Sequence, residues 1–264
     1  MIKNLVRQLI FEIFILLARI FQCQKRRGIP VFVYHSIDDS GSPLSTPPSI
    51  FEKRMAYLQK HRFEPITASQ AIARIQSGHN FHRCVAITFD DAYVAINPTL
   101  EILTKQRLQT TIFVPSGFLG KTNLWDINNT HYPQLPIMTC DHLKKLQHEL
   151  GSHTRTHPNL PDIEDSQLEH ELTGARINLE QAFSNPVPLL AYPFGAYNPH
   201  VMEMAKHAGY KAAFTTQLGY LTPHTHPFAI PRFPSNLDDV QFRMVVHGAY
   251  PWYRRLQNHL FGTP

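Results

Sequence analysis

The chain has 264 residues, of which 43% are apolar and 17% charged, as in a well-packed α/β enzyme and unlike a disordered protein. Its net charge of +5 is compatible with an anionic partner, but beyond Lys25–Arg27 there is no dense basic stripe or nucleic-acid motif, so no nucleic-acid partner is expected. The scattered Cys23, Cys84 and Cys140 predict neither a disulfide framework nor a cysteine zinc site.

The first predicted element is a helix over residues 4–22, where Leu, Ile and Phe side chains fill a broad face. Arg7, Glu12 and Arg19 interrupt this apolar run, so it falls short of the roughly 18 uninterrupted apolar residues of a clear membrane span. The basic run Lys25–Arg27 follows, and the combination favours a helix that lies on an anionic membrane surface. The alternatives are a single membrane-spanning anchor and a soluble helix that packs on the domain or on a second subunit.

We therefore expect the chain to have two parts. Residues 1–27 are an amphipathic, membrane-associating helix with a basic linker, and residues 28–264 are one globular domain. The protein is expected at a membrane, through peripheral contact or a single N-terminal anchor, with the cytoplasmic face favoured over the periplasmic one. The sequence leaves its oligomeric state open.

Beyond residue 28, strand-like runs alternate with helical patterns. The strand-like runs fall near residues 31–35, 85–89, 111–114, 148–152, 187–192, 211–216 and 227–232. Thr67 and Gln70 have the spacing of a capping box that opens one helix, and another helix follows Asn198 and ends before Gly209. A third spans residues 166–183, with an apolar face of Leu168, Leu172, Ile177 and Leu179. This alternation predicts a parallel, barrel-like sheet.

Two adjacent carboxylates, Asp90 and Asp91, end the apolar run 85–89. Neighbouring strand side chains point to opposite faces, so within a core strand one of these acids would be buried without a partner. At the end of the strand both can turn toward one cavity, where a metal ion or a proton would compensate their repulsion. The alternative is an acidic turn after an edge strand.

His153 and His157 are four residues apart, a spacing that allows two imidazoles to converge on one ion. One carboxylate of the Asp pair would complete a set of two histidines and one aspartate, which leaves coordination positions open for water and substrate. Such a set suits Zn²⁺, and Fe²⁺, Co²⁺ and Ni²⁺ are alternatives. We therefore expect a divalent metal as cofactor, with zinc favoured.

Three ordered motifs carry a resemblance to a known family: Thr88-Phe-Asp-Asp91, His153-Thr-x-x-His157-Pro and Tyr192-Pro-Phe-Gly195. Together they resemble the motifs of the polysaccharide deacetylases, the NodB-homology group or carbohydrate esterase family four. The resemblance implies an α/β fold, a distorted barrel of about seven βα units, over the catalytic domain 28–264. It also implies that Asp90 is the general base and that Asp91, His153 and His157 bind the metal.

One departure from the family pattern concerns the residue that orients the base. The third motif of the family usually begins with an Arg, but Ala191 stands at that position here. Arg232, which follows a strand-like run late in the chain, is our candidate for this orienting role. The alternative is that Arg232 is a solvated cation at a strand end.

A second departure concerns the general acid, which most family members carry as a histidine near the C-terminus. Here the late candidate is His247, but His35 ends the first strand-like run and stands in a Tyr-His pair. That pair resembles a circularly permuted branch that includes poly-N-acetylglucosamine deacetylases. A barrel whose first and last strands are neighbours tolerates such a permutation. We favour His35 as the acid over His247.

These assignments predict a metal-dependent hydrolase that removes N-acetyl groups from amino sugars of a polysaccharide or a lipid-linked glycan. A backbone N–H near Phe194 is a candidate oxyanion donor, and Tyr192 and Phe194 are expected either to line the substrate pocket or to pack in the core. The expected partners are an N-acetylated glycan and a membrane surface. The alternatives are an O-deacetylase, a deformylase of a lipid-linked sugar, and a non-catalytic glycan-binding or scaffold relative.

Overall fold

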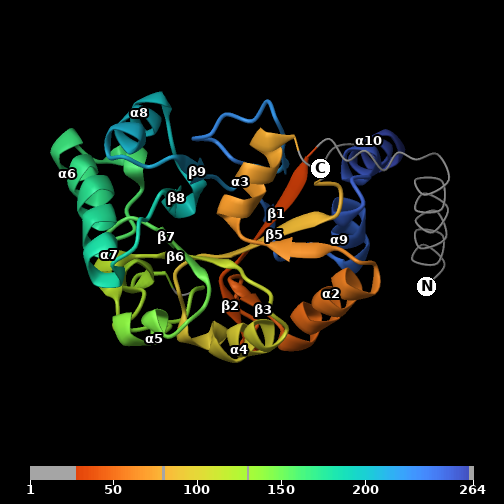
Figure 1. Cartoon of the computed structure of the whole chain (residues 1–264), viewed down its shortest axis with the longest axis horizontal. Coiled ribbons are helices and arrows are strands. Elements are labelled where there is room, and N and C mark those ends of the chain that lie inside the picture. The colour runs from red at the N-terminus through yellow and green to blue at the C-terminus, as the bar shows by residue number, and fades with distance from the viewer. Residues whose placement is uncertain (1–27, 79–80, 130, 262–264) are drawn as a thin grey trace.

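The structure is a computed structural model that describes residues 28–78, 81–129 and 131–261. Its centre is a nine-stranded sheet with the order β10-β1-β5-β6-β7-β8-β9, in which β11 also pairs with β1 and β4 with β5 (Figure 1). These strands are β1 (Ile29–Tyr34), β4 (Glu64–Ile66), β5 (Cys84–Phe89), β6 (Thr111–Val114), β7 (Glu149–Ser152), β8 (Leu189–Ala191), β9 (Ala212–Phe214), β10 (Tyr220–Leu221) and β11 (Phe233–Pro234). A small parallel pair, β2 (Ser36–Ile37) and β3 (Ser45–Thr46), follows β1.

The sheet curls because its last segment returns to its first strand. Ile230 forms a parallel bridge with Phe214 of β9, and Phe233 of β11 pairs in parallel with Phe32 of β1. β1 therefore lies between β5 and β11, so that the first and last parallel strands are neighbours. This arrangement confirms the distorted α/β barrel, with the order of strands that the permuted branch requires.

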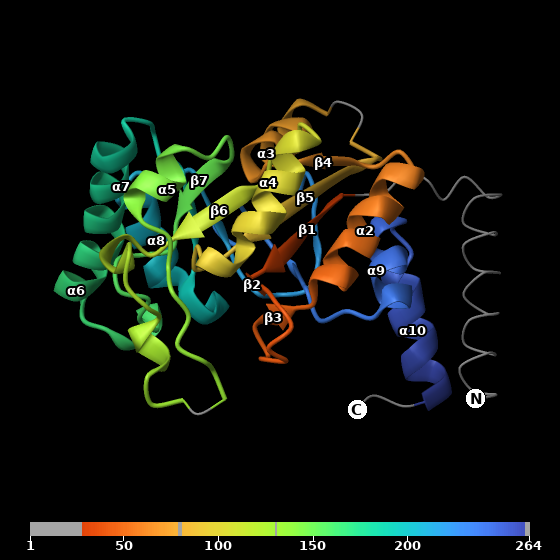
Figure 2. The ribbon, with the colours of Figure 1, turned by 90° about the horizontal axis from the view of Figure 1, so that it is seen from below.

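Helices cover the outside of the curled sheet, as Figures 1 and 2 show from two directions. They are α2 (Pro48–Lys60), α3 (Ala68–Ser77), α4 (Asn97–Lys105), α5 (Cys140–Lys144), α6 (Asp165–Glu169), α7 (Ala175–Phe183), α8 (Pro199–His207), α9 (Asp239–Val246) and α10 (Tyr250–Phe261). The capping box of Thr67 and Gln70 opens α3 as expected, and the Asn198 side chain caps α8. Because the helices occupy the outer face, the strand ends remain free to form a site at the rim.

The two faces of the central strands pack into different parts of the core. Phe32 and Tyr34 of β1 belong to a large cluster that includes Phe51 of α2. Their neighbour Val31 belongs to a second cluster with Phe214 of β9. Because β1, β5 and β6 are buried along their whole length, their sequences are continuous apolar runs rather than alternating ones.

Two of the sequence expectations about elements are wrong. The run 227–232 is not a strand, since only Ile230 bridges to the sheet and β11 begins at Phe233. Pro227 and Pro231 have no N–H to donate to a ladder, which limits regular pairing in this run. Ile177 does not belong to the apolar face of its helix, because it is exposed to solvent.

The predicted helix over residues 166–183 is present, but it contains a π-helical stretch, His170–Gly174, between α6 and α7. The predicted helix over residues 4–22 lies outside the described residues. Among the described residues, no helix is both long and apolar enough to span a bilayer. The division at residue 27, the membrane association and the oligomeric state stay predictions.

Candidate active site

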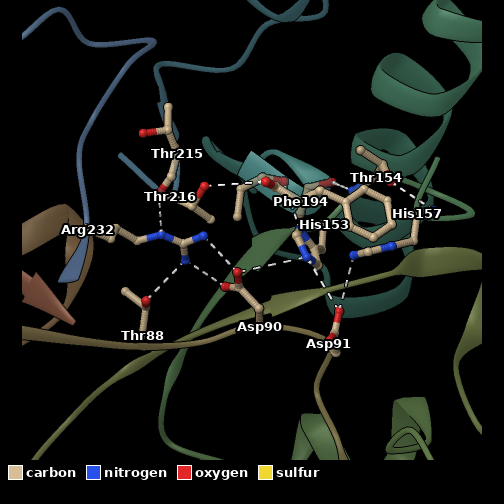
Figure 3. A network of polar contacts seen from close by, with 12 residues as sticks. Thr88, Asp90, Asp91, His153, Thr154, His157, Phe194, Thr215, Thr216 and Arg232 are labelled. Atoms are coloured by element: carbon tan, nitrogen blue, oxygen red, sulfur yellow. Dashed lines mark hydrogen bonds and ion pairs between the residues drawn. The ribbon is translucent and has the colours of Figure 1, made fainter. Parts of the chain in front are cut away.

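The site lies where the parallel strands end, because several of its polar residues directly follow a strand. Asp90 and Asp91 follow β5, His153 follows β7, and His35 follows β1. The carboxyl ends of parallel strands meet at one rim, where backbone leaves the sheet and side chains can converge. The residues singled out from the sequence at these three strand ends therefore come together, as Figure 3 shows for the acids and for the imidazoles of His153 and His157.

Asp91, His153 and His157 form a candidate metal site, in which one ligand atom from each residue lies within 4.8 Å of the others. Asp91 Oδ1 is 3.4 Å from Nε2 of His153 and 3.5 Å from Nε2 of His157. Nδ1 of His153 lies 2.8 Å from the carbonyl oxygen of Ala191, which can only accept, so Nδ1 donates and the lone pair of Nε2 faces Asp91. This is the tautomer that a metal ligand needs.

The electrostatics of the cluster fit a bound cation. Burial and the neighbouring Asp90 raise the pKa of Asp91 well above its usual value. Burial and the neighbouring His153 hold the pKa of His157 well below its usual value, so this imidazole is neutral. Asp91 Oδ1 is buried and accepts no hydrogen bond from any described residue. A divalent ion would compensate the acid and use the imidazole lone pairs, so these residues fit a metal.

Several site residues have a backbone conformation that L-residues rarely adopt. The φ angles are 66° at Asp91, 63° at Thr154, 61° at His157 and 58° at Phe194. Each such residue carries a strain of about 1 kcal/mol or more, and such strain is tolerated where the surrounding structure over-determines the backbone. Four of them around one cluster indicate a rim shaped for function.

Asp90 is held on its other side by Arg232, whose side chain is completely buried. Two nitrogens of the guanidinium lie 2.7 Å from the two carboxylate oxygens, and Nε donates to the carbonyl of Thr215 at 3.0 Å (Figure 3). Burial alone would raise the pKa of Asp90, but Arg232 and His153 more than offset this and hold it below its usual range. Asp90 is therefore ionised and fixed in orientation, and the alternative of a solvated Arg232 is wrong.

The two histidines considered as the acid lie in different surroundings. His35 is partly buried at the rim, where burial lowers its pKa to about 4 although the charge of Asp90 acts in the opposite direction. His247 ends α9, with Nε2 2.9 Å from the hydroxyl of Tyr57 and its ring against Phe63. The contacts of His247 are thus in the aromatic packing beside α2, and the geometry favours His35.

The two aromatic residues of the third motif differ in their surroundings. Tyr192 is completely buried, and its hydroxyl donates to the carbonyl of Phe228 at 3.1 Å. The expectation that Tyr192 lines the substrate pocket is therefore replaced by its alternative, core packing. Phe194 is 58% exposed, and its ring meets the ring of His157 edge-on at 4.7 Å. It thus remains available to a substrate beside the candidate metal site.

Glu171 is a site residue that the sequence reading missed. It lies in the π-helical stretch, is buried, and accepts from the backbone N–H groups of Arg155 at 2.9 Å and Thr156 at 2.7 Å. The loop that joins His153 to His157 is thereby anchored to the helix. The signal was present in the sequence, because an acid three residues after Leu168 stands on the apolar face of the predicted helix.

Comparison with known proteins agrees with this geometry. Residues 78–213 match the family of polysaccharide deacetylases. The fold and the His–Asp cluster define a hydrolase of this class, and the chain belongs to the polysaccharide deacetylase family.

Two curated relatives are similar over most of the chain. YxkH of Bacillus subtilis (strain 168), which carries the provisional name of polysaccharide deacetylase, is 28% identical over 214 residues, which are 79% of this chain and 72% of that protein. A poly-beta-1,6-N-acetyl-D-glucosamine N-deacetylase of Staphylococcus aureus (strain MSSA476) is 24% identical over 189 residues, which are 70% of this chain. The match spans only 65% of the length of that second relative.

Solved structures have the same fold. IcaB from Ammonifex degensii superposes with a TM-score of 0.69 and 19% identity, over 85% of this chain and 97% of that one. A polysaccharide deacetylase from Bacillus cereus superposes with a TM-score of 0.69 and 23% identity, over 83% of this chain and 69% of that one.

Proposed function

We propose that this chain is a divalent-metal-dependent deacetylase that removes N-acetyl groups from amino sugars of a polysaccharide or a lipid-linked glycan. The proposal rests on one observation. The ligand atoms of Asp91, His153 and His157 lie close together in a buried site, and Asp90 lies beside them with both carboxylate oxygens bound by Arg232. The name of the Staphylococcus aureus relative, a poly-beta-1,6-N-acetyl-D-glucosamine N-deacetylase, supports an amide of glucosamine as the bond that is cleaved.

Asp91, His153 and His157 would hold the metal, with zinc as our first choice and iron, cobalt or nickel as alternatives. When bound, such an ion polarises the acetyl carbonyl and lowers the pKa of a water molecule. Asp90 would accept the proton of the attacking water. Its oxygen Oδ2 lies 3.9 Å from Nε2 of His153, beside the ligands. Arg232 makes Asp90 a weak base but keeps both oxygens in place, so the step depends on an acidified water.

His35 would deliver a proton to the nitrogen of the departing amino sugar. Because the pKa of His35 is lowered to about 4, the imidazole is neutral near pH 7. It would therefore take up the proton released by water through Asp90 and pass it on as the carbon–nitrogen bond breaks. Water thus supplies the hydroxyl of acetate and the proton of the free amine.

The turn that carries Phe194 would complete the site. The N–H groups of Gly195 and Ala196 donate within the turn, to the carbonyls of Tyr192 at 2.9 Å and Pro193 at 3.0 Å. The N–H of Phe194 is the proposed oxyanion donor beside the metal. The exposed ring of Phe194 would lie against the apolar face of the sugar.

The test is acetate release by the purified full-length chain with Zn²⁺, from oligomers of N-acetylglucosamine in β-1,6 and in β-1,4 linkage. We expect release with wild type, and a loss of at least about 100-fold in Asp90→Asn, because removal of a general base costs about 10²–10⁴ in rate. The matched control is Asp165→Asn, an exposed carboxylate on α6. Metal binding without acetate release from any N-acetylated glycan would contradict the proposal.

The same assay separates the alternative activities. Acetate release from O-acetylated but not N-acetylated glycans would indicate an O-deacetylase, and formate release would indicate a deformylase. A non-catalytic scaffold would bind glycan with no release at all. The contact between Arg232 and Asp90 weighs against a non-catalytic scaffold. The proposed base keeps an orienting arginine, although Ala191 stands at the position where the family usually has one.

We further propose that residues 1–27 attach the enzyme to an anionic membrane, beside the assembly of its glycan. The amphipathic pattern of residues 4–22 and the basic run Lys25–Arg27 support this. Full-length protein should pellet with vesicles that contain anionic lipid and should be released as ionic strength rises, if it is peripheral. Protein that stays in the supernatant with such vesicles at moderate salt contradicts the proposal.

A further inference from the structure

The long segment between β6 and α5 is fastened next to the candidate metal site. Met138 N–H donates to the carbonyl of Ala92 at 2.9 Å, and Val94 N–H donates to the carbonyl of Pro136 at 2.8 Å. Ala92 directly follows the candidate ligand Asp91. In Figure 2 the segment is the yellow-green loop that extends from the strand ends. Its base is therefore tied to the same backbone that positions Asp91.

A buried asparagine shapes the middle of this segment. Asn123 is inaccessible to solvent, and its Nδ2 donates to Asp126 Oδ2 at 3.0 Å and to the carbonyl of Pro133 at 3.1 Å. Its Oδ1 accepts from Leu135 N–H at 2.6 Å. These bonds hold the short 3-10 turn Leu124–Asp126 in a defined position. Trp125 lies within that turn.

Trp125 packs directly on the candidate ligand His157. The two rings are stacked, with centroids 4.4 Å apart and planes inclined by 23°. Phe118 meets Trp125 edge-on at 5.1 Å, which supports the indole. Phe194 and His153 meet the same imidazole edge-on, each at a centroid distance of 4.7 Å. The His157 ring is thus enclosed by other rings.

His157 differs from His153 in the way its ring is oriented. His153 donates through Nδ1 to a backbone carbonyl, which is the usual means of fixing a ligand imidazole. Nδ1 of His157 is buried and has no hydrogen-bond partner among the described residues. The rotation of the His157 ring is therefore controlled by ring contacts, and the face-to-face contact with Trp125 is the one that restricts its tilt.

We propose that Trp125 is a positioning residue for His157, which replaces the missing hydrogen bond by stacking and so sets the metal affinity of the site. This inference rests on the metal site of the proposed function and not on its substrate. Stacking restricts the plane of the His157 ring, so the side chain at position 125 must be flat and aromatic to hold it. An apolar side chain of similar bulk fills the space without holding the imidazole.

The test compares Trp125→Phe and Trp125→Leu in the full-length chain, with Zn²⁺ affinity measured by competition with a chromophoric chelator. We expect Trp125→Leu to weaken Zn²⁺ binding by about two- to tenfold and Trp125→Phe to bind Zn²⁺ almost as tightly as wild type, since aromatic pairs contribute at this level. Trp252→Leu is the matched control, because Trp252 is 61% exposed on α10. Circular dichroism confirms that each variant is folded. Equal Zn²⁺ affinity in Trp125→Leu, Trp125→Phe and wild type would overturn the proposal.

A double-mutant cycle tests whether Trp125 acts through His157. In the His157→Ala background, Trp125→Leu should leave the residual Zn²⁺ affinity unchanged, because the ring it positions is gone. Equal losses in both backgrounds would assign Trp125 a general structural role and overturn the inference.

Tryptophan fluorescence provides a second test of the contact between Trp125 and His157. Its two tryptophans are Trp125 and Trp252, so Trp252→Phe leaves Trp125 as the single indole emitter. Zn²⁺ should change its fluorescence with the dissociation constant found by competition, and an unchanged spectrum at saturation would contradict the contact. Acetate release is measured separately. A chain that binds metal but releases no acetate contradicts the proposed function and leaves the Trp125 result standing.

Discussion

At the scale of single residues, Asp90 and Arg232 form an ion pair at the candidate site. Both side chains are buried, and both carboxylate oxygens are engaged by one guanidinium. A buried ion pair contributes little net stability, but loss of one partner leaves an uncompensated charge. The pair is therefore better explained by the orientation it imposes on a base than by the stability of the fold.

Arg232→Met tests this explanation. We expect the free energy of unfolding to fall by about 3–5 kcal/mol, because the charge of Asp90 stays buried without its partner. The double variant Asp90→Asn with Arg232→Met should recover part of that loss while acetate release stays absent. Urea denaturation measures stability, and a single variant as stable as wild type would show that the charge of Asp90 is compensated elsewhere.

His35 makes the metal-free protein sensitive to acid. Its pKa falls from 6.5 to about 4 on folding, so between these values the unfolded chain binds a proton that the folded chain does not. Stability therefore rises with pH across this window and is lost as pH falls through it. From pH 7 to pH 4.5 the expected loss from this group is about 2 kcal/mol.

His35→Asn removes that contribution. Under chelating conditions the variant should lose about 2 kcal/mol less than wild type between pH 7 and pH 4.5, as measured by urea denaturation. Parallel pH profiles of the two proteins would contradict the lowered pKa of His35.

At the scale of elements, the π-helical stretch His170–Gly174 anchors a neighbouring loop through Glu171. It turns Glu171 toward the loop that joins the two candidate ligands, where its carboxylate accepts from Arg155 and Thr156 N–H. Single π-helical turns inside α-helices are frequent at functional sites. Here the stretch carries the side chain that supports the candidate ligand loop.

Glu171→Ala should lower the free energy of unfolding by about 2 kcal/mol, because two backbone donors lose charge-assisted partners. It should also weaken Zn²⁺ binding by about tenfold, the lower end of the range for lost outer-shell contacts. Glu169→Ala, an exposed acid on α6, is the control and should change neither quantity. Unchanged Zn²⁺ affinity in Glu171→Ala would mean that the loop keeps its shape without the anchor.

At the scale of the whole molecule, we expect the candidate metal site to reduce the stability of the metal-free fold. The raised pKa of Asp91 means that burial beside Asp90 disfavours its charged form. Removal of that charge should stabilise the metal-free protein, whereas removal of a ligand should abolish stabilisation by metal. The two effects have opposite signs and can be measured on one variant.

Asp91→Asn is expected to raise the free energy of unfolding of the chelated protein by about 1 kcal/mol. Wild type with Zn²⁺ at 100 times its dissociation constant should gain about 2.7 kcal/mol, and Asp91→Asn should gain little at the same concentration. Thermal denaturation with and without chelator measures both quantities. An equal Zn²⁺-induced gain in the two proteins would remove Asp91 from the ligand set.

Much of the fold was predictable because its signals are local. The runs near 85–89 and 111–114 became β5 and β6, the capping box at Thr67 opened its helix, and a helix followed Asn198 as expected. The strand expected at 227–232 failed, because proline blocks the pairing that its apolar residues favour. Trp125 and the π-helical stretch were not predictable, since each depends on contacts between segments far apart in the sequence.

The residue types present set which chemistry is available: two acids at a strand end and two histidines four residues apart, in motifs that identify the family. How these groups divide their roles depends on contacts between segments that are distant in the chain. The tertiary structure brought Arg232 to Asp90, the Ala191 carbonyl to His153, Trp125 to His157 and the hydroxyl of Tyr192 into the core. The physical reason is that residue type sets what a group can bind, whereas burial and partners set its charge and direction.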